Sequence, residues 1–147
     1  MQANVEAADF KCANLTKTNF SKAQLPKARL DAAKIHDADF SHTNLEGANL
    51  GSASLNNSNF VEVKAQGARM SRCGLAGAKF AKADLRDVDL SDSTGAEVAF
   101  VGCQLDGAYF DRADLSYGFL TDSVGTGLSA VRTKMVGLSG ENAQLIG

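Results

Sequence analysis

Large apolar residues recur at every fifth position along most of this chain. From Val5 to Leu120 the pattern has two exceptions, Ala65 and Gly95. Two residues before each large residue stands a small one, which is Ala in 15 of the 29 repeats. A period of five fits neither an α-helix nor a β-strand. A short repeat of this regularity indicates a solenoid whose coils stack around a shared core.

The five positions of each repeat have distinct characters. We call the large residue the core position and the residue two before it the small position, and we expect both to point inward. The residue between them is the outer position, which is often Asp or Asn, as in Asp9, Asn49 and Asp84. The two residues after the core position are the first and second corner positions, where we expect the chain to turn.

A second, longer period gives the size of one coil. Phe occupies the core position at Phe20, Phe40, Phe60, Phe80 and Phe100, and Leu120 continues the row. Twenty residues are four repeats, so we expect four sides of five residues, with residues twenty apart stacked and the Phe rings in one column. The 29 repeats then make about seven coils, and a rod about 35 Å long at the spacing of neighbouring strands. We number the sides one to four by the columns that contain Leu25, Leu30, Ile35 and Phe40.

The repeats resemble a known family. Blocks such as Ala13-Asn14-Leu15, Ala48-Asn49-Leu50 and Ala83-Asp84-Leu85 follow the pattern A(D/N)LXX. This pattern, which covers essentially the whole chain, is similar to that of pentapeptide-repeat proteins. The resemblance implies an all-β fold, a right-handed, four-sided parallel β-helix. Because the frame runs from Ala3 to Gly147 without insertion, we expect residues 1–147 to form a single domain.

Two sites break the core pattern without compensation. Ser93 stands with Gly95, and Ser123 with Gly125, so both inward positions are small. There we expect the wall to pinch, bulge or admit water, and Gly95 is a candidate for a bulge or a close backbone approach. Pro26 falls at a first corner position, where a missing N–H matters least.

The residues that would carry catalysis or bind a metal are scarce and scattered. His36 and His42 fall at corners, and no CxxC spacing is present. We therefore expect no catalytic residue, no metal site and no cofactor. Two of the three cysteines, Cys73 and Cys103, occupy small positions as core residues, and Cys12 lies at a corner. Free cysteines, no signal peptide and no membrane-length apolar stretch favour the cytoplasm, with secretion by a dedicated bacterial system left open.

The formal charge of −2 conceals an uneven distribution. Residues 1–83 carry a net charge of +4, residues 84–122 carry −7, and residues 123–147 carry +1. We call residues 84–122 the acidic belt, and expect its field to steer a partner. The weak basic half, without interleaved aromatic residues, does not indicate direct binding of nucleic acid.

These features favour a non-catalytic scaffold for protein–protein interaction. Such repeats also occur as domains of larger bacterial proteins, including effectors and secretion-associated proteins, and this context stays open, as does the partner's identity. Tyr109, Tyr117 and Phe119 fall within one coil beside the acidic belt, so we expect them to form a single contact patch, because aromatic residues beside charged ones are typical of an interface centre. The candidate partner-binding residues are Asp87, Asp106, Asp111, Tyr109, Tyr117 and Phe119.

The family resemblance also implies an alternative function. Some pentapeptide-repeat proteins mimic duplex DNA, bind type II topoisomerases such as DNA gyrase and confer quinolone resistance. The acidic belt fits this alternative in part, whereas the basic first half argues against it.

The last coil carries a further candidate site. Leu145 occupies a core position at the end of the frame, with Leu138 and Ile146 nearby. Open β edges recruit another chain unless something blunts them. We therefore expect a homodimer in which two C-terminal ends meet through Leu138, Leu145 and Ile146. The alternatives are a monomer whose last coil is disordered or capped, or a further segment that covers this end.

Overall fold

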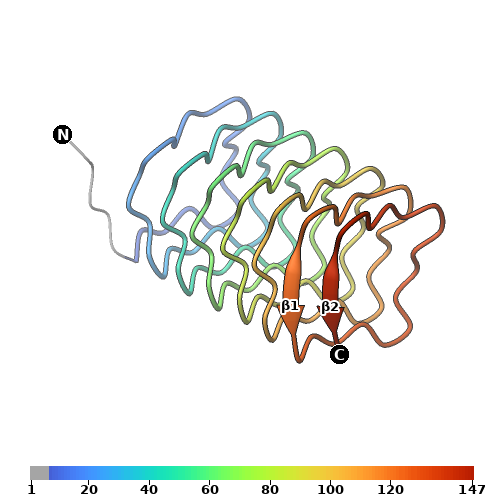
Figure 1. The fold of residues 1–147 in the computed structure, drawn as a ribbon. Coiled ribbons are helices and arrows are strands. Elements are labelled where there is room, and N and C mark those ends of the chain that lie inside the picture. The colour runs from blue at the N-terminus through green and yellow to red at the C-terminus, as the bar shows by residue number, and fades with distance from the viewer. Residues whose placement is uncertain (1–6) are drawn as a thin grey trace.

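The computed structural model describes residues 7–147, which form a four-sided rod of stacked coils (Figure 1). Parallel bridges join residues twenty apart, from Asp9 with Arg29 to Phe119 with Ser139. At the C-terminal end the ladder includes two short strands, β1 (Val124–Thr126) and β2 (Gln144–Ile146). They pair in parallel, with Gly125 opposite Leu145. The coil of twenty residues is therefore confirmed, and the part of the repeat frame at residues 3–6 lies outside the described residues.

One repeat in the middle of the rod shows where the backbone N–H groups go. In residues 48–52, the N–H groups of Asn49, Leu50 and Ser52 donate to carbonyl oxygens of neighbouring coils, at 2.9, 2.7 and 2.9 Å. The N–H of Ala48 closes the preceding corner by donating to the carbonyl of Leu45. Only the N–H of Gly51, at the first corner position, has no backbone acceptor. It donates instead to Oδ1 of Asn49 at 3.1 Å.

The same side-chain cap recurs along the rod. Ten Asp or Asn residues at outer positions accept the N–H of the residue two positions later, among them Asp9, Asn19, Asp39 and Asp89. This is the local bond that makes Asp and Asn favourable in turns. The Asp or Asn of the repeat pattern thus satisfies the one N–H that the coils leave unpaired. Pro26 has no N–H at this position, so it fits without loss, as expected.

Every corner uses left-handed backbone. All 28 second corner positions from Ala7 to Asn142 have φ between 54° and 67°, and 21 of them are not glycine. At most corners the N–H of the small residue also donates to the carbonyl of the core residue three positions earlier, as Ala48 does to Leu45, and the two features together match a type II turn. A non-glycine residue in this region costs about 1 kcal/mol. The ladder bonds on both sides of each corner must offset that cost.

The core is the stack of inward side chains. The phenylalanine column is present, with ring centroids of Phe20, Phe40, Phe60, Phe80 and Phe100 separated by 4.8–5.2 Å and the ring planes nearly parallel. Phe40 to Phe100 are fully buried. The small positions leave room for these rings, so large and small residues fill the interior together.

Polar residues at small positions are bonded between coils. The buried hydroxyl of Ser93 donates to the carbonyl of Met70 at 2.8 Å and accepts the N–H of Cys73 at 3.1 Å. Ser123 does the same with the carbonyl of Phe100 and the N–H of Cys103. Because the buried hydroxyls of Ser93 and Ser123 each donate and accept a hydrogen bond, their burial reduces the stability of the core little. Burial raises the pKa of the Cys73 and Cys103 thiols to about 12, and all three cysteines are free.

At the two glycine sites the wall pinches and does not bulge. The N–H of Gly95 still donates to the carbonyl of Asp114 at 2.8 Å, so the ladder continues. A Cβ atom at Gly95 would lie 3.1 Å from Cβ of Leu75, and one at Gly125 would lie 2.9 Å from the carbonyl carbon of Leu105. The atoms nearest to such a Cβ atom at Gly95 all belong to the side chains of Leu75 and Val98, so the close approach of a neighbouring backbone occurs at Gly125 and not at Gly95.

The phenylalanine column yields a direct test of this core. Phe60 stacks on Phe40 at 5.2 Å and on Phe80 at 4.8 Å, in the middle of the rod. We expect Phe60→Ala to lower the free energy of unfolding by about 3–5 kcal/mol, because the coils on both sides hold the cavity open. Denaturant titration measures the change, with exposed Lys64→Ala as the control. A near-neutral Phe60→Ala would show that the core positions do not face inward.

Candidate interaction surfaces

Four of the candidate partner-binding residues share one face of the rod. Asp87 and Asp106 lie at the corner between sides one and two, and Asp111 lies at the corner between sides two and three. Tyr109 stands between these corners at an outer position of side two, with 51% of its surface exposed. We call these four residues the side-two face.

Two carboxylates of this face hold the following coil. Asp106 accepts the N–H and the hydroxyl of Thr126, both at 2.9 Å. Asp111 accepts the N–H of Val131 at 2.9 Å and the hydroxyl of Ser129 at 2.6 Å. The bond from the Thr126 N–H lowers the pKa of the Asp106 carboxyl, and the bond from the Ser129 hydroxyl lowers that of Asp111. Both carboxyls therefore have a structural role in addition to their charge.

These bonds follow a rule that the sequence analysis missed. Thr126 and Val131 occupy first corner positions whose own outer residues, Val124 and Ser129, are neither Asp nor Asn. The cap comes instead from the first corner position of the preceding coil. Asn56 caps the N–H of Ala76 in the same way, at 3.1 Å, where Gly74 occupies the outer position. The sequence signal for this kind of cap is an Asp or Asn that stands eighteen residues before an outer position whose own side chain cannot accept the first corner N–H.

The third carboxylate, Asp87, is less constrained. Its Oδ2 lies 3.5 Å from Nε2 of Gln66. Its Oδ1 occupies the space over Gly107, where a Cβ atom would lie only 2.5 Å away. Asp87 also closes one end of a groove that runs along this corner past Gly67, Gly47 and Lys27. Of the three candidate carboxylates it is the one best placed to meet a partner.

Elsewhere the acidic belt is partly neutralised. Arg86 pairs with Asp84 and Arg112 with Asp92, each at 2.6 Å. Lys134, from beyond the belt, pairs with Asp114 at 3.0 Å. The hydroxyl of Ser116 and the Lys134 ammonium lower the pKa of Asp114 to about 2. These pairs reduce the field that the belt presents to a distant partner.

The other two aromatic candidates lie away from the side-two face. Phe119 is ten residues from Tyr109, which is half a coil, so the two side chains stand on opposite sides of the rod. Tyr117 lies at the corner between sides three and four, next to Phe119, and its ring rests on Gly137 of the following coil. The six candidates therefore form two surfaces, not the single cluster that their proximity in sequence suggested.

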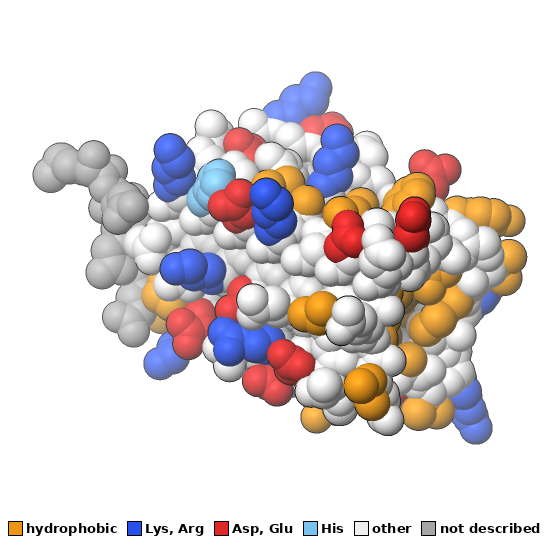
Figure 2. All heavy atoms as spheres, viewed as in Figure 1, with side chains coloured by type: hydrophobic (Ala, Val, Ile, Leu, Met, Phe, Trp, Pro, Cys, Tyr) orange, Lys and Arg blue, Asp and Glu red, His pale blue; other side chains and the backbone are white. Residues whose placement is uncertain are grey.

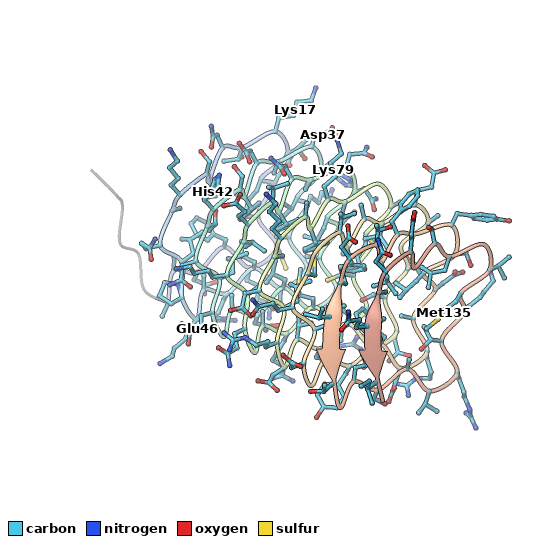
Figure 3. The ribbon with its side chains drawn as sticks, in the orientation of Figure 1. Lys17, Asp37, His42, Glu46, Lys79 and Met135 are labelled. Carbon is cyan, nitrogen blue, oxygen red and sulfur yellow. The ribbon has the colours of Figure 1, made fainter. Side chains whose placement is uncertain are left out.

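The C-terminal end of the rod is apolar. Leu138 and Leu145 are half-buried, whereas Ile146 is 66% exposed. Met135 occupies a core position and is nevertheless 41% exposed, because it belongs to the last coil (Figure 3). Figure 2 shows hydrophobic side chains gathered at this end, whereas charged side chains are more frequent over the rest of the visible face. The C-terminal end face consists of Val131, Met135, Val136, Leu138, Leu145 and Ile146.

The histidines do not form a site. His42 lies at a corner with Nδ1 3.2 Å from Oε2 of Glu62, and His36 lies at another corner. Within residues 7–147, no three His, Cys, Asp or Glu side chains are grouped so that they could hold a metal ion. In the same described range, no helix has the length and apolar character needed to cross a membrane.

Comparison with solved structures identifies the fold. The chain matches a trypsin-treated form of QnrB1, a plasmid-mediated fluoroquinolone resistance protein, with a TM-score of 0.66 and 16% identity, over 97% of this chain and 81% of that one. It also matches Rfr23, a pentapeptide repeat protein from the cyanobacterium Cyanothece 51142, with a TM-score of 0.53 and 20% identity, over 95% and 89% of the two chains. At these identities the likeness concerns the fold alone, which is the expected right-handed, four-sided parallel β-helix.

Comparison of the sequence identifies the family. No curated protein is significantly similar to this chain. Family models do match it: the model described as a pentapeptide repeat region covers residues 33–110, and the one described as pentapeptide repeats (8 copies) covers residues 1–37. The chain therefore belongs to the pentapeptide-repeat family.

Proposed function

We propose that this protein is a non-catalytic scaffold that binds other proteins through the C-terminal half of its rod. One observation carries the proposal. All eight large apolar side chains that are exposed in residues 7–147 lie between Tyr109 and Ile146. Apolar surface gathered in one region of a soluble fold marks an interaction site more often than scattered residues do.

The rod is suited to this role because its faces are rigid. Each coil is bonded to the next at every side, so a side chain at an outer or corner position is held in a fixed register. Preorganised surfaces lose little conformational entropy on binding. Tyr109, Tyr117 and Phe119 are aromatic residues of the kind that dominate binding energy at interfaces. A cytoplasmic protein or a domain of a larger bacterial protein would both use such surfaces.

The C-terminal end face has a specific partner in this proposal, which is a second copy of the chain. In the other coils the N–H of a core residue donates to a carbonyl of the following coil, as Leu115 does to Lys134. The last coil has no following coil, so the N–H groups of its core residues point along the axis of the rod without such an acceptor. An open edge of this kind pairs readily with another chain. A two-fold arrangement, in which the same end of each copy meets, closes the assembly and stops further growth.

The dimer can be tested at the exposed residues of this end. We expect light scattering to give twice the 15.4 kDa mass of one chain. Replacing Met135 and Ile146 together with Lys should give a monomer, because two like charges would face their copies across the contact. Tyr109→Lys, on the side-two face, is the matched control and should leave the dimer intact. A wild-type monomer at high protein concentration would rule out this assembly.

The acidic belt supports a second candidate function, that of a DNA mimic that binds a type II topoisomerase. Residues 84–122 carry a net charge of −7. DNA is also negatively charged, so a DNA-binding protein would attract this surface. The ion pairs of Asp84, Asp92 and Asp114 weaken this candidate, as does the basic first half of the rod. We therefore rank it below the scaffold.

An assay with DNA gyrase distinguishes the two candidates. A DNA mimic at micromolar concentration should inhibit supercoiling or protect the enzyme from a quinolone. The effect should weaken when Asp87, Asp106 and Asp111 are all changed to Asn. Asn keeps an oxygen that can cap Thr126 and Val131, so this variant removes charge while preserving the coil. If the wild-type protein neither inhibits nor protects, the topoisomerase function is excluded.

A further inference from the structure

A shallow hollow lies along the corner between sides two and three, in the basic half of the rod. Its volume is about 390 Å³, and it spans several coils. The residues stacked at the first corner position are Lys11, Asp31, Gly51 and Ser71. The small residues Gly51 and Ser71 leave the hollow open on the C-terminal side of the longer Lys11 and Asp31. Arg69 and Arg72 line its C-terminal side.

The floor of the hollow is polar. Gly51 leaves the floor open: a Cβ atom there would lie 3.3 Å from Oδ1 of Asn49, 3.8 Å from the carbonyl oxygen of Ser71 and 4.0 Å from its hydroxyl. Ser52 and Asn49 also line the hollow. Oδ1 of Asn49 is taken by the N–H of Gly51, which leaves the amide Nδ2 as the free donor. The hydroxyls of Ser52 and Ser71 can donate hydrogen bonds to a ligand here, beside the acceptor oxygens of Asn49 and of the Ser71 backbone.

Within residues 7–147, neither of the two arginines that line the hollow is held in an ion pair. Among the described residues, neither Arg69 nor Arg72 has a carboxylate within 4.0 Å. Of the two carboxylates stacked directly on them, Asp92 is neutralised by an ion pair, whereas Asp89 keeps its negative charge. Asp89, which follows Arg69 in its column, caps the N–H of Ser91 at 3.0 Å. Asp92, which follows Arg72, accepts hydrogen bonds from Nε and Nη2 of Arg112 at 2.6 and 2.8 Å.

The one carboxylate that lines the hollow is already paired. Asp31 lies 3.4 Å from the ammonium of Lys11 and 3.9 Å from Nε of Arg29. Arg29 in turn bonds to Asp9 at 3.0 Å. These four residues form a separate ion-pair network at the N-terminal end of the hollow. The positive charge beside the hollow is therefore that of Arg69 and Arg72, reduced by the neighbouring Asp89 carboxylate.

We propose that this hollow binds a phosphate monoester through Arg69 and Arg72. A guanidinium group donates two parallel hydrogen bonds to phosphate, and two such groups with neighbouring hydroxyl donors suit a dianion with several acceptor oxygens. The hollow is wider than one phosphate group, so the ester carries a further group along the corner. That group belongs either to a small metabolite or to a phosphorylated side chain of a protein.

NMR titration at low salt tests the site with two probes, inorganic phosphate and O-phosphoserine. We expect saturable shifts at the Arg69 and Arg72 side chains and at the Ser52 and Ser71 amides. The double variant Arg69→Gln, Arg72→Gln should weaken binding at least tenfold, since it removes several charge-assisted hydrogen bonds. Arg132→Gln is the matched control, because Arg132 occupies the same corner column as Arg72, with φ of 58° against 60°. It should leave the affinity unchanged.

The two probes and a peptide identify the source of the ester. Tighter binding of a phosphoserine peptide than of O-phosphoserine favours a phosphorylated protein, and equal binding favours a small metabolite. Shifts that do not saturate, or that Arg132→Gln reduces as much as the double variant does, would overturn the proposal. This result would be independent of the dimer and gyrase measurements, which concern other surfaces.

Discussion

The hydrogen bonds between coils twenty residues apart are the constraint on which the rest of this structure depends. They fix the register in which residue n lies on residue n+20, and so they align the phenylalanine rings, the small residues and the corners into columns. They also stabilise 21 non-glycine residues in left-handed backbone that each would avoid in isolation. A parallel ladder repeated on four sides distributes that strain evenly along the rod.

The ladder leaves the first corner N–H of each repeat without a backbone acceptor, and this deficit explains much of the outer surface. The Asp or Asn of the repeat pattern satisfies that N–H, as Asn49 does for Gly51. Where the pattern fails, a residue of the preceding coil can replace it, as Asp106 does for Thr126. A charged surface residue of this fold can therefore be needed to hold the coil as well as to bind a partner. The same logic keeps Arg69 and Arg72 out of ion pairs, because one oxygen of Asp89 accepts a cap and Asp92 pairs with Arg112.

The fold could be predicted from sequence because its determinants are periodic. The spacing of Phe20, Phe40 and Phe60 gives the four sides directly, and the alternation of small and large residues gives the inward positions. The caps from the preceding coil were not predicted, since they depend on two residues in different coils. The bonds of the buried Ser93 hydroxyl are of the same kind. The grouping of Tyr109 with Phe119 failed for a simpler reason: proximity within one coil does not place two residues on the same side.

The central structural role of Asp and Asn at outer positions is to satisfy the first corner N–H. One corner, between sides four and one, offers an internal comparison over adjacent coils. Ser41 and Val61 are capped by Asp39 and Asn59. Among the described residues, Ala81 and Val101 have no such cap, because Lys79 and Ala99 occupy the outer positions.

Amide hydrogen exchange of these four residues, corrected for intrinsic rates, is the most direct measurement. The account predicts protection factors about fivefold to tenfold higher for the Ser41 and Val61 amides than for those of Ala81 and Val101, as one hydrogen bond would give. Equal protection of all four amides would contradict it.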